Sequence, residues 1–133
     1  MRVLASPELL DQRTKILDDF VSLLGQNRAM RFAYVEEVTR GKDLQLLRER
    51  VEDVLVSWGS LWRDVLVRTS GAVSTTQNPD RVDDIERLAS MLNPDQVFHA
   101  LQKTMESIDA IHRFGNIRMV LETLMLDLPT LSL

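Results

Sequence analysis

The chain has no cysteine among its 133 residues, and this absence excludes disulfide bonds and thiolate metal sites. A long apolar run is also missing, since no stretch approaches the roughly 20 residues that cross a bilayer. The first seven residues contain one arginine and none of the apolar segment found in secretion signals. We therefore expect a cytoplasmic protein with no membrane contact.

An excess of positive charge is missing as well. The 16 lysine and arginine residues are scattered among 20 acidic residues, which gives a net charge of −4. Strong binding to nucleic acid depends on clustered basic side chains that neutralise phosphates. Direct contact with DNA is therefore not expected. The alternative, a helical nucleic-acid-binding module, would depend on the local group Arg28, Arg31, Arg40 and Lys42.

Catalytic and metal-binding motifs are absent from the sequence. Of the two histidines, His99 is expected to be solvated, whereas His112 falls on an apolar arc and is expected in the core or at an interface. Neighbouring acidic residues on a helix diverge by about 100° and cannot jointly bind one ion. Nothing resembles a glycine-rich phosphate loop. We expect no enzymatic activity, no cofactor and no metal.

Helical periodicity runs through nearly the whole chain and predicts an all-α fold, a single compact bundle of about six helices in one domain, 1–133. Side-chain caps followed by proline and an acidic residue mark three helix starts, at Ser6-Pro7-Glu8, Asn78-Pro79-Asp80 and Asn93-Pro94-Asp95. Glycines at 25, 41, 71 and 115 mark helix ends. The predicted helices span 7–24, 27–40, 44–69, 79–92, 94–114 and 116–128.

The long third helix, 44–69, is predicted to be central. Its apolar residues form an arc of roughly 140°, wide enough to face several helices. Trp58 and Trp62 lie on this arc and are interpreted as core residues rather than binding hot spots. Val56 and Val67 fall outside the arc, on a small second face that a partner could cover. The arc consists of Leu44, Leu47, Val51, Val54, Leu55, Trp58, Leu61, Trp62, Val65 and Leu66.

Two further features leave alternatives open. Arg63 and Asp64 fall on the polar side of the third helix, either as an exposed charged pair or as part of an intersubunit salt bridge. The chain ends on alternating leucines between Leu126 and Leu133. This tail either folds back onto the core or presents a protein-binding surface.

Three stretches together resemble the C-terminal domain of bacterial DNA polymerase III clamp-loader subunits. They are Trp62-Arg63-Asp64 with the following Val65-Leu66, the helix from Asn78 to Leu92, and the closing segment from Asn116 to Leu124. The pattern is most similar to delta-prime subunits, and the gamma/tau subunits share much of it. The resemblance extends from about residue 5 onward, and its motifs are mostly packing positions in helices.

The resemblance implies a non-catalytic collar domain that follows ATPase-fold domains in a longer subunit and assembles with its counterparts in other subunits. It implies no direct nucleotide binding and only indirect contact with DNA. The rival hypothesis is an unrelated helical adaptor that binds a peptide in a groove. The residues expected at the interface with other subunits are Val56, Arg63, Asp64, Val67, His112, Asn116, Arg118 and Glu122.

Overall fold

The computed structural model describes residues 7–72, 75–113 and 115–132, and within these residues it contains helices and no strand. The all-α prediction with six helices is confirmed. The described helices are α1 (Pro7–Leu24), α2 (Arg28–Val38), α3 (Leu44–Ser70), α4 (Val82–Met91), α5 (Pro94–Arg113) and α6 (Ile117–Asp127), with a 3₁₀ turn, η1 (Pro79–Arg81), before α4.

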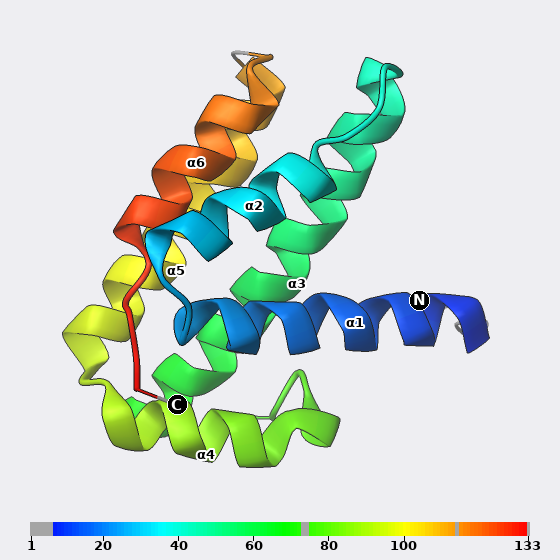
Figure 1. The fold of residues 1–133 in the computed structure, drawn as a ribbon. Helices are drawn as coiled ribbons and strands as arrows, with labels where there is room; N and C mark the ends of the chain where they lie inside the picture. The colour runs from blue at the N-terminus through cyan, green and yellow to red at the C-terminus, as the bar shows by residue number, and fades with distance from the viewer. Residues whose placement is uncertain (1–6, 73–74, 114, 133) are drawn as a thin grey trace.

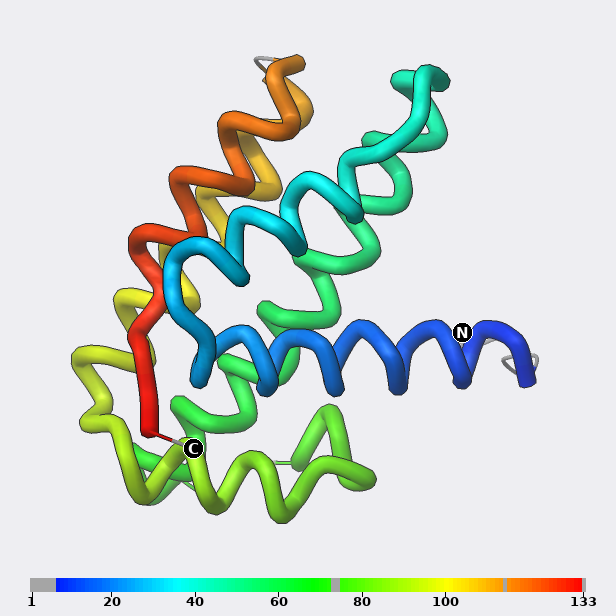
Figure 2. The backbone as a smooth tube through the Cα atoms, viewed as in Figure 1, coloured from blue at the N-terminus to red at the C-terminus, as the bar shows by residue number. Residues whose placement is uncertain are grey.

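Helix α3 runs through the middle of the bundle, as its wide apolar arc predicts. It packs against α1, α4 and most extensively against α5, while α6 packs between α5 and α2 (Figure 1). The tube view shows α1 crossing α3, with α2 lying beside α6 and α4 closing the lower end (Figure 2). No helix in the described part of the chain is long and apolar enough to cross a membrane.

Aromatic side chains fill the centre of the core. Phe20 of α1 stacks on Trp58 with ring centroids 4.9 Å apart, and it meets Trp62 edge to face at 5.3 Å. Both tryptophans are fully buried, which confirms their interpretation as core residues. Their indole N–H groups find no acceptor among the described residues, so the ring contacts and burial account for their placement.

The apolar arc of α3 is buried along most of its length but not at its beginning. Leu44 is 52% exposed and Leu47 is only half-buried, so the prediction that the arc is buried from Leu44 onward is wrong for the first turn. The physical reason is positional, because an open cleft lies between the first turn of α3 and the start of α6.

Some of the predicted helix caps and helix-ending glycines are confirmed and others are not. Asn93 and Gln96 form a reciprocal capping box, with side-chain to backbone bonds of 2.9 and 3.0 Å. Gly71 ends α3 in the left-handed conformation, at φ 74°. Gly25 follows the end of α1 but is not left-handed, so the chain turns there without glycine's special conformation. The predicted cap Ser6 lies outside the described residues.

The prediction that Asn78 caps a helix is wrong. The chain enters a 3₁₀ turn at Pro79 and becomes α-helical only at Val82, and Asn78 makes no side-chain capping bond. Its side chain is 1% exposed and bonds to α3 instead. The buried polar partners on α3 offer Asn78 stronger bonds than an exposed helix end would.

The C-terminal segment folds back onto the bundle, at least as far as the structure describes it. Leu128 is buried, Leu131 packs against the core, and the Leu131 N–H donates to the Leu24 carbonyl at 2.7 Å. Leu126 remains 55% exposed on α6, and Leu133 lies outside the described residues. The alternative in which the leucine tail as a whole forms a free binding surface is therefore wrong.

Candidate interface with other subunits

The expected interface residues fall into two surface groups and one buried position. Val56, Arg63, Val67 and His112 lie along α3 and α5, whereas a second group, Asn116, Arg118 and Glu122, belongs to the start of α6. Asp64 is the buried position, with 6% exposure. The structure therefore separates the expected residues instead of gathering them at one point.

The first group lies where α3 and α5 pack antiparallel (Figure 1). Glu52 near the start of α3 pairs with His112 near the end of α5, at 3.1 Å between Oε1 and Nε2. Gly59, in the middle of α3, faces Met105 of α5. We call this surface the α3–α5 face. At helical spacing it comprises Glu52, Val56, Arg63 and Val67 of α3 with Phe98, Leu101, Met105, Ile108 and His112 of α5, whereas Gly59 is buried.

Several apolar side chains on the α3–α5 face are exposed to solvent. Val56 is 51% exposed, Phe98 55% and Met105 44%. Leu101 and Ile108 are half-buried between these residues and the core, at helical spacing along α5. Exposed apolar side chains that gather on one face can mark a place where another protein packs.

His112 is exposed, so of the two expected positions the core is wrong, and a position at an interface stays a prediction. The buried face of α5 instead contains Thr104 and Ser107, whose hydroxyls donate to the backbone carbonyls of Ala100 and Lys103 at 2.8 Å. Because these bonds satisfy the hydroxyls within the helix, small polar residues can occupy the contact with α3. The buried face of α5 is therefore rotated about the helix axis from the face that hydropathy alone predicts. His99 is exposed, as expected.

The second group surrounds the start of α6. Asn116 caps the helix, because its side chain accepts the Met119 N–H at 3.1 Å. Arg118 and Glu122 form an exposed ion pair one turn apart, at 3.2 Å. Such a pair contributes little to stability by itself. An open cleft of about 750 Å³ lies beside these residues, lined by Glu36, Thr39, Arg40, Leu44, Leu47, Gly115, Asn116, Ile117 and Arg118.

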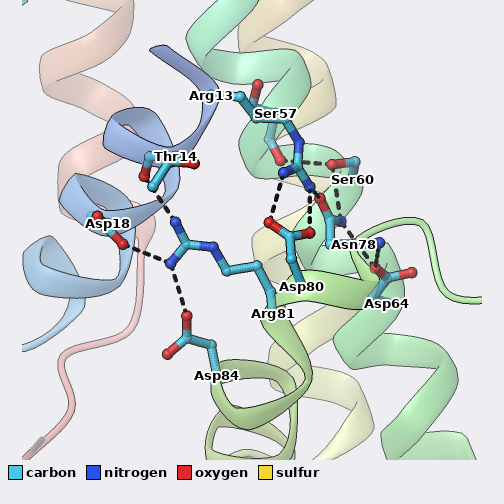
Figure 3. Close-up of polar contacts among 10 residues, drawn as sticks. All are labelled: Arg13, Thr14, Asp18, Ser57, Ser60, Asp64, Asn78, Asp80, Arg81 and Asp84. Atoms are coloured by element: carbon cyan, nitrogen blue, oxygen red, sulfur yellow. Dashed lines mark hydrogen bonds and ion pairs between the residues drawn. The ribbon is translucent and has the colours of Figure 1, made fainter. Parts of the chain in front are cut away.

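The carboxylate of Asp64 is bound within the chain (Figure 3). Its Oδ1 accepts the backbone N–H of Gln77 at 2.9 Å, and its Oδ2 accepts the backbone N–H and the side-chain amide of Asn78 at 2.7 and 2.9 Å. The expectation of an exposed Arg63–Asp64 pair is therefore wrong, since only Arg63 is exposed. Asp64 fixes the segment that follows α3.

Arg13 joins α1 to the same segment. Its guanidinium bonds to the Asn78 side-chain oxygen and to the Asp80 carboxylate, the latter at 2.9 Å (Figure 3). The hydrogen bond from Arg13 holds the pKa of Asp80 below its usual value, although partial burial opposes the shift. The start of α1 is thus tied to η1 through one cation.

Arg81 makes a second connection between α1 and α4. Its guanidinium contacts Asp18 at 2.7 Å, Asp84 at 3.0 Å and the Thr14 carbonyl at 2.8 Å (Figure 3). Burial acts to lower the pKa of Arg81, but the bonds to Asp18 and Asp84 outweigh it and raise the pKa overall. This contact and the Arg13 contact hold the first helix on the second half of the chain.

Arg31 is buried, with 4% exposure, and this weakens the nucleic-acid-binding alternative that would have used it. Its guanidinium donates to the backbone carbonyls of Leu23 at 2.9 Å and Met125 at 2.8 Å. Further bonds reach the carbonyls of Leu24, Leu128 and Pro129. The cation thereby bonds to carbonyls at the C-terminal ends of α1 and α6 together. Burial lowers the pKa of Arg31.

Sequence reasoning misses these buried polar residues for an identifiable reason. The local pattern places Asn78 at a helix cap and Arg31 in a surface basic group. The partners of Arg31 lie up to 98 positions away in the sequence, so no local pattern indicates them. Among the described residues, no group of three histidine, aspartate or glutamate side chains is arranged to hold a metal ion.

Comparison with known proteins identifies one family. Residues 7–130 match the family model described as DNA polymerase III, delta subunit, C terminal. No curated protein and no solved structure matches the chain.

Proposed function

The chain belongs to the family formed by the C-terminal region of the DNA polymerase III delta subunit, and we propose that it is a non-catalytic collar domain that assembles a clamp loader. The match over 7–130 carries this proposal, because it covers every described helix. In this role the domain binds other clamp-loader subunits and supports the loading of sliding clamps in the bacterial cytoplasm. It contacts DNA only indirectly and binds no nucleotide itself.

The α3–α5 face is the surface that best suits contact with a neighbouring subunit. Val56, Phe98 and Met105 expose apolar area there, while the Glu52–His112 pair and Arg63 supply polar groups at its margin. Apolar centres with polar rims are typical of protein interfaces. The second expected group, at the start of α6, would form a separate contact, as a domain with neighbours on two sides requires.

We also propose that the domain is the C-terminal part of a longer subunit whose preceding domains have an ATPase fold. Whether that subunit is delta or delta-prime is a separate question. The matching family model is that of delta, whereas the sequence pattern is most similar to delta-prime. Delta-prime therefore stays a prediction. Adding the chain to loader mixtures that lack either delta or delta-prime distinguishes the two, because the domain should join the mixture that lacks its own subunit.

The proposal is tested by co-purification with the remaining clamp-loader subunits of the source organism. The double substitution Val56→Glu and Met105→Glu places two charges on the α3–α5 face and should weaken association at least tenfold. A matched control, Met30→Glu with Leu126→Glu, changes two residues of similar exposure on α2 and α6. This control should leave association within about twofold if the face is specific.

Two results would count against the proposal. The first is failure of the unmodified chain to associate with any loader subunit. The second is tight, steeply salt-dependent binding to primed DNA by the chain alone, which would favour the nucleic-acid-binding module instead. Equal weakening by the face variant and by the control would reject the α3–α5 face while leaving the collar role in place.

A further inference from the structure

A groove on the side of the bundle has no role in the contacts described above. Its lining residues come from α1, α2 and α3, and its volume is about 440 Å³. Apolar side chains form part of its wall: Ile16, Tyr34, Val38 and Val54. The remaining lining residues are polar or charged: Gln12, Lys15, Asp19, Glu37, Arg50 and Asp53.

The positive charges of this groove already have partners within the chain. Lys15 pairs with Asp19 one turn later on α1, at 2.8 Å. Arg50 donates to the backbone carbonyls of Val38 and Arg40, at 3.2 and 2.9 Å, where it caps the end of α2. Neither cation is paired with the other acidic residues of the groove.

Two carboxylates, by contrast, lack such partners. Glu37 and Asp53 make no ion pair with any residue that the structure describes, although they line the same groove from α2 and α3. Partial burial, together with the nearby charges of Glu52 and Glu49, raises the pKa of Asp53. The groove thus places more carboxylates than cations beside apolar surface, and the charge of Glu37 is only partly offset by that of nearby Lys15.

Tyr34 contributes an aromatic ring to the wall of the same groove. The ring is half-buried, and its centroid lies 6.0 Å from that of Trp58. Burial raises the pKa of the Tyr34 phenol, and the charges of Asp19 and Glu37 raise it further. The charges of Asp19 and Glu37 therefore act on a ring that packs against Trp58.

We propose that this groove binds an arginine side chain presented by a segment of the adjacent clamp-loader subunit. An arginine stem can pack on apolar and aromatic surface, and its planar guanidinium can donate to two carboxylates at once. Lysine fits less well because its compact ammonium cannot form the paired bonds. The inference rests on the proposed function for the source of the arginine, and on charge complementarity for the site.

The site can be tested without any partner, because Tyr34 is the only tyrosine in the chain. N-acetyl-arginine amide should shift the NMR signals of the Tyr34 ring and saturate in roughly the millimolar range. N-acetyl-lysine amide should act more weakly, and sodium chloride at equal ionic strength should give no saturable shift. The variant Glu37→Gln with Asp53→Asn should lose the response, and absence of a response in the unmodified chain overturns the site.

Whether the groove binds an arginine of the adjacent subunit is tested in the reconstituted loader. The same groove variant should bind the other subunits at least fivefold more weakly. The matched control Glu8→Gln with Asp83→Asn, which removes the same charge from exposed positions, should not. The groove variant should not lower Tm, because neither carboxylate makes an ion pair with a residue that the structure describes. A lower Tm would indicate a structural role and overturn the proposal.

The partner segment can be identified because the chain contains no cysteine. A photoreactive label on Gln12→Cys should crosslink to a loader segment that contains arginine, whereas a label on exposed Ser90→Cys should not. Crosslinking to a segment without arginine rejects the proposed occupant. If the groove variant associates normally, this inference fails while the collar role stands. If the unmodified chain joins no loader subunit, both fail.

Discussion

Asp64 and Asn78 are joined by two hydrogen bonds to one carboxylate oxygen, from the Asn78 backbone N–H at 2.7 Å and from its side-chain amide at 2.9 Å. The residues are 14 positions apart, and the bonds fix how the chain leaves α3 and begins the second half of the bundle. Since Arg13 of α1 also bonds to Asn78, one buried carboxylate organises three parts of the fold.

The first prediction concerns this carboxylate. Asp64→Asn replaces one acceptor oxygen with an amide that faces N–H donors, so at least one buried donor loses its partner. The free energy of unfolding should fall by about 2–3 kcal/mol, as measured by urea denaturation. Asp83→Asn, an exposed change on α4, should alter it by less than about 0.5 kcal/mol. Equal effects of the two substitutions would contradict the structural role of Asp64.

The second prediction concerns Arg31, which ties the end of α1 to the end of α6. Lysine has three donors without the planar fork and cannot replace its bonds to carbonyls on both helices. Arg31→Lys should therefore lower the free energy of unfolding by about 3 kcal/mol. Amide hydrogen exchange at Leu131, whose N–H bonds to Leu24, should accelerate because the C-terminal segment loosens. Exposed Arg28→Lys is the control, and unchanged exchange at Leu131 in Arg31→Lys would contradict the prediction.

The third prediction concerns pH. The folded pKa of Asp80 is lowered, mainly by its bond from Arg13. The unfolded chain therefore holds this proton more tightly, so the stabilisation is present above about pH 4 and is lost as the pH falls through the lower folded pKa.

Asp80→Asn removes this titration and should make Tm less sensitive to pH below about 5. Because Asp80 is about half exposed, the contribution should be small, about 0.2–1 kcal/mol. Asp83→Asn serves as the comparison. A pH profile that Asp80→Asn leaves parallel to that of the unmodified chain would show that the ion pair contributes no pH-dependent stability.

The fourth prediction concerns Gly59, which lies inside α3 and faces α5. A Cβ at this position would sit 3.6 Å from the Met105 sulfur and 3.9 Å from the Thr104 methyl, which are ordinary contacts. Gly59→Ala should therefore raise the free energy of unfolding by about 0.5–1 kcal/mol through better helix propensity. Gly71→Ala should lower it by about 1 kcal/mol, because Gly71 is left-handed. A destabilising Gly59→Ala would show that α3 and α5 cannot adjust to a methyl group.

How well burial could be predicted from the sequence differs between residues. Apolar periodicity located all six helices and the burial of Trp58 and Trp62, because helix geometry converts spacing directly into a face. The same rule failed on α5, where Thr104 and Ser107 are buried and His112 is not. Hydropathy assigns small hydroxyl residues to the surface, but in a helix they can bond to their own backbone and pack closely.

The sequence by itself determined the helices, the central position of α3 and the absence of catalytic motifs, since these follow from local spacing and composition. The tertiary structure alone decided which polar residues are buried. Arg31, Asp64 and Asn78 look like surface or capping residues locally, and they are buried because distant backbone and side-chain groups satisfy them. A polar side chain is buried only where such partners converge, and their convergence depends on how the helices pack.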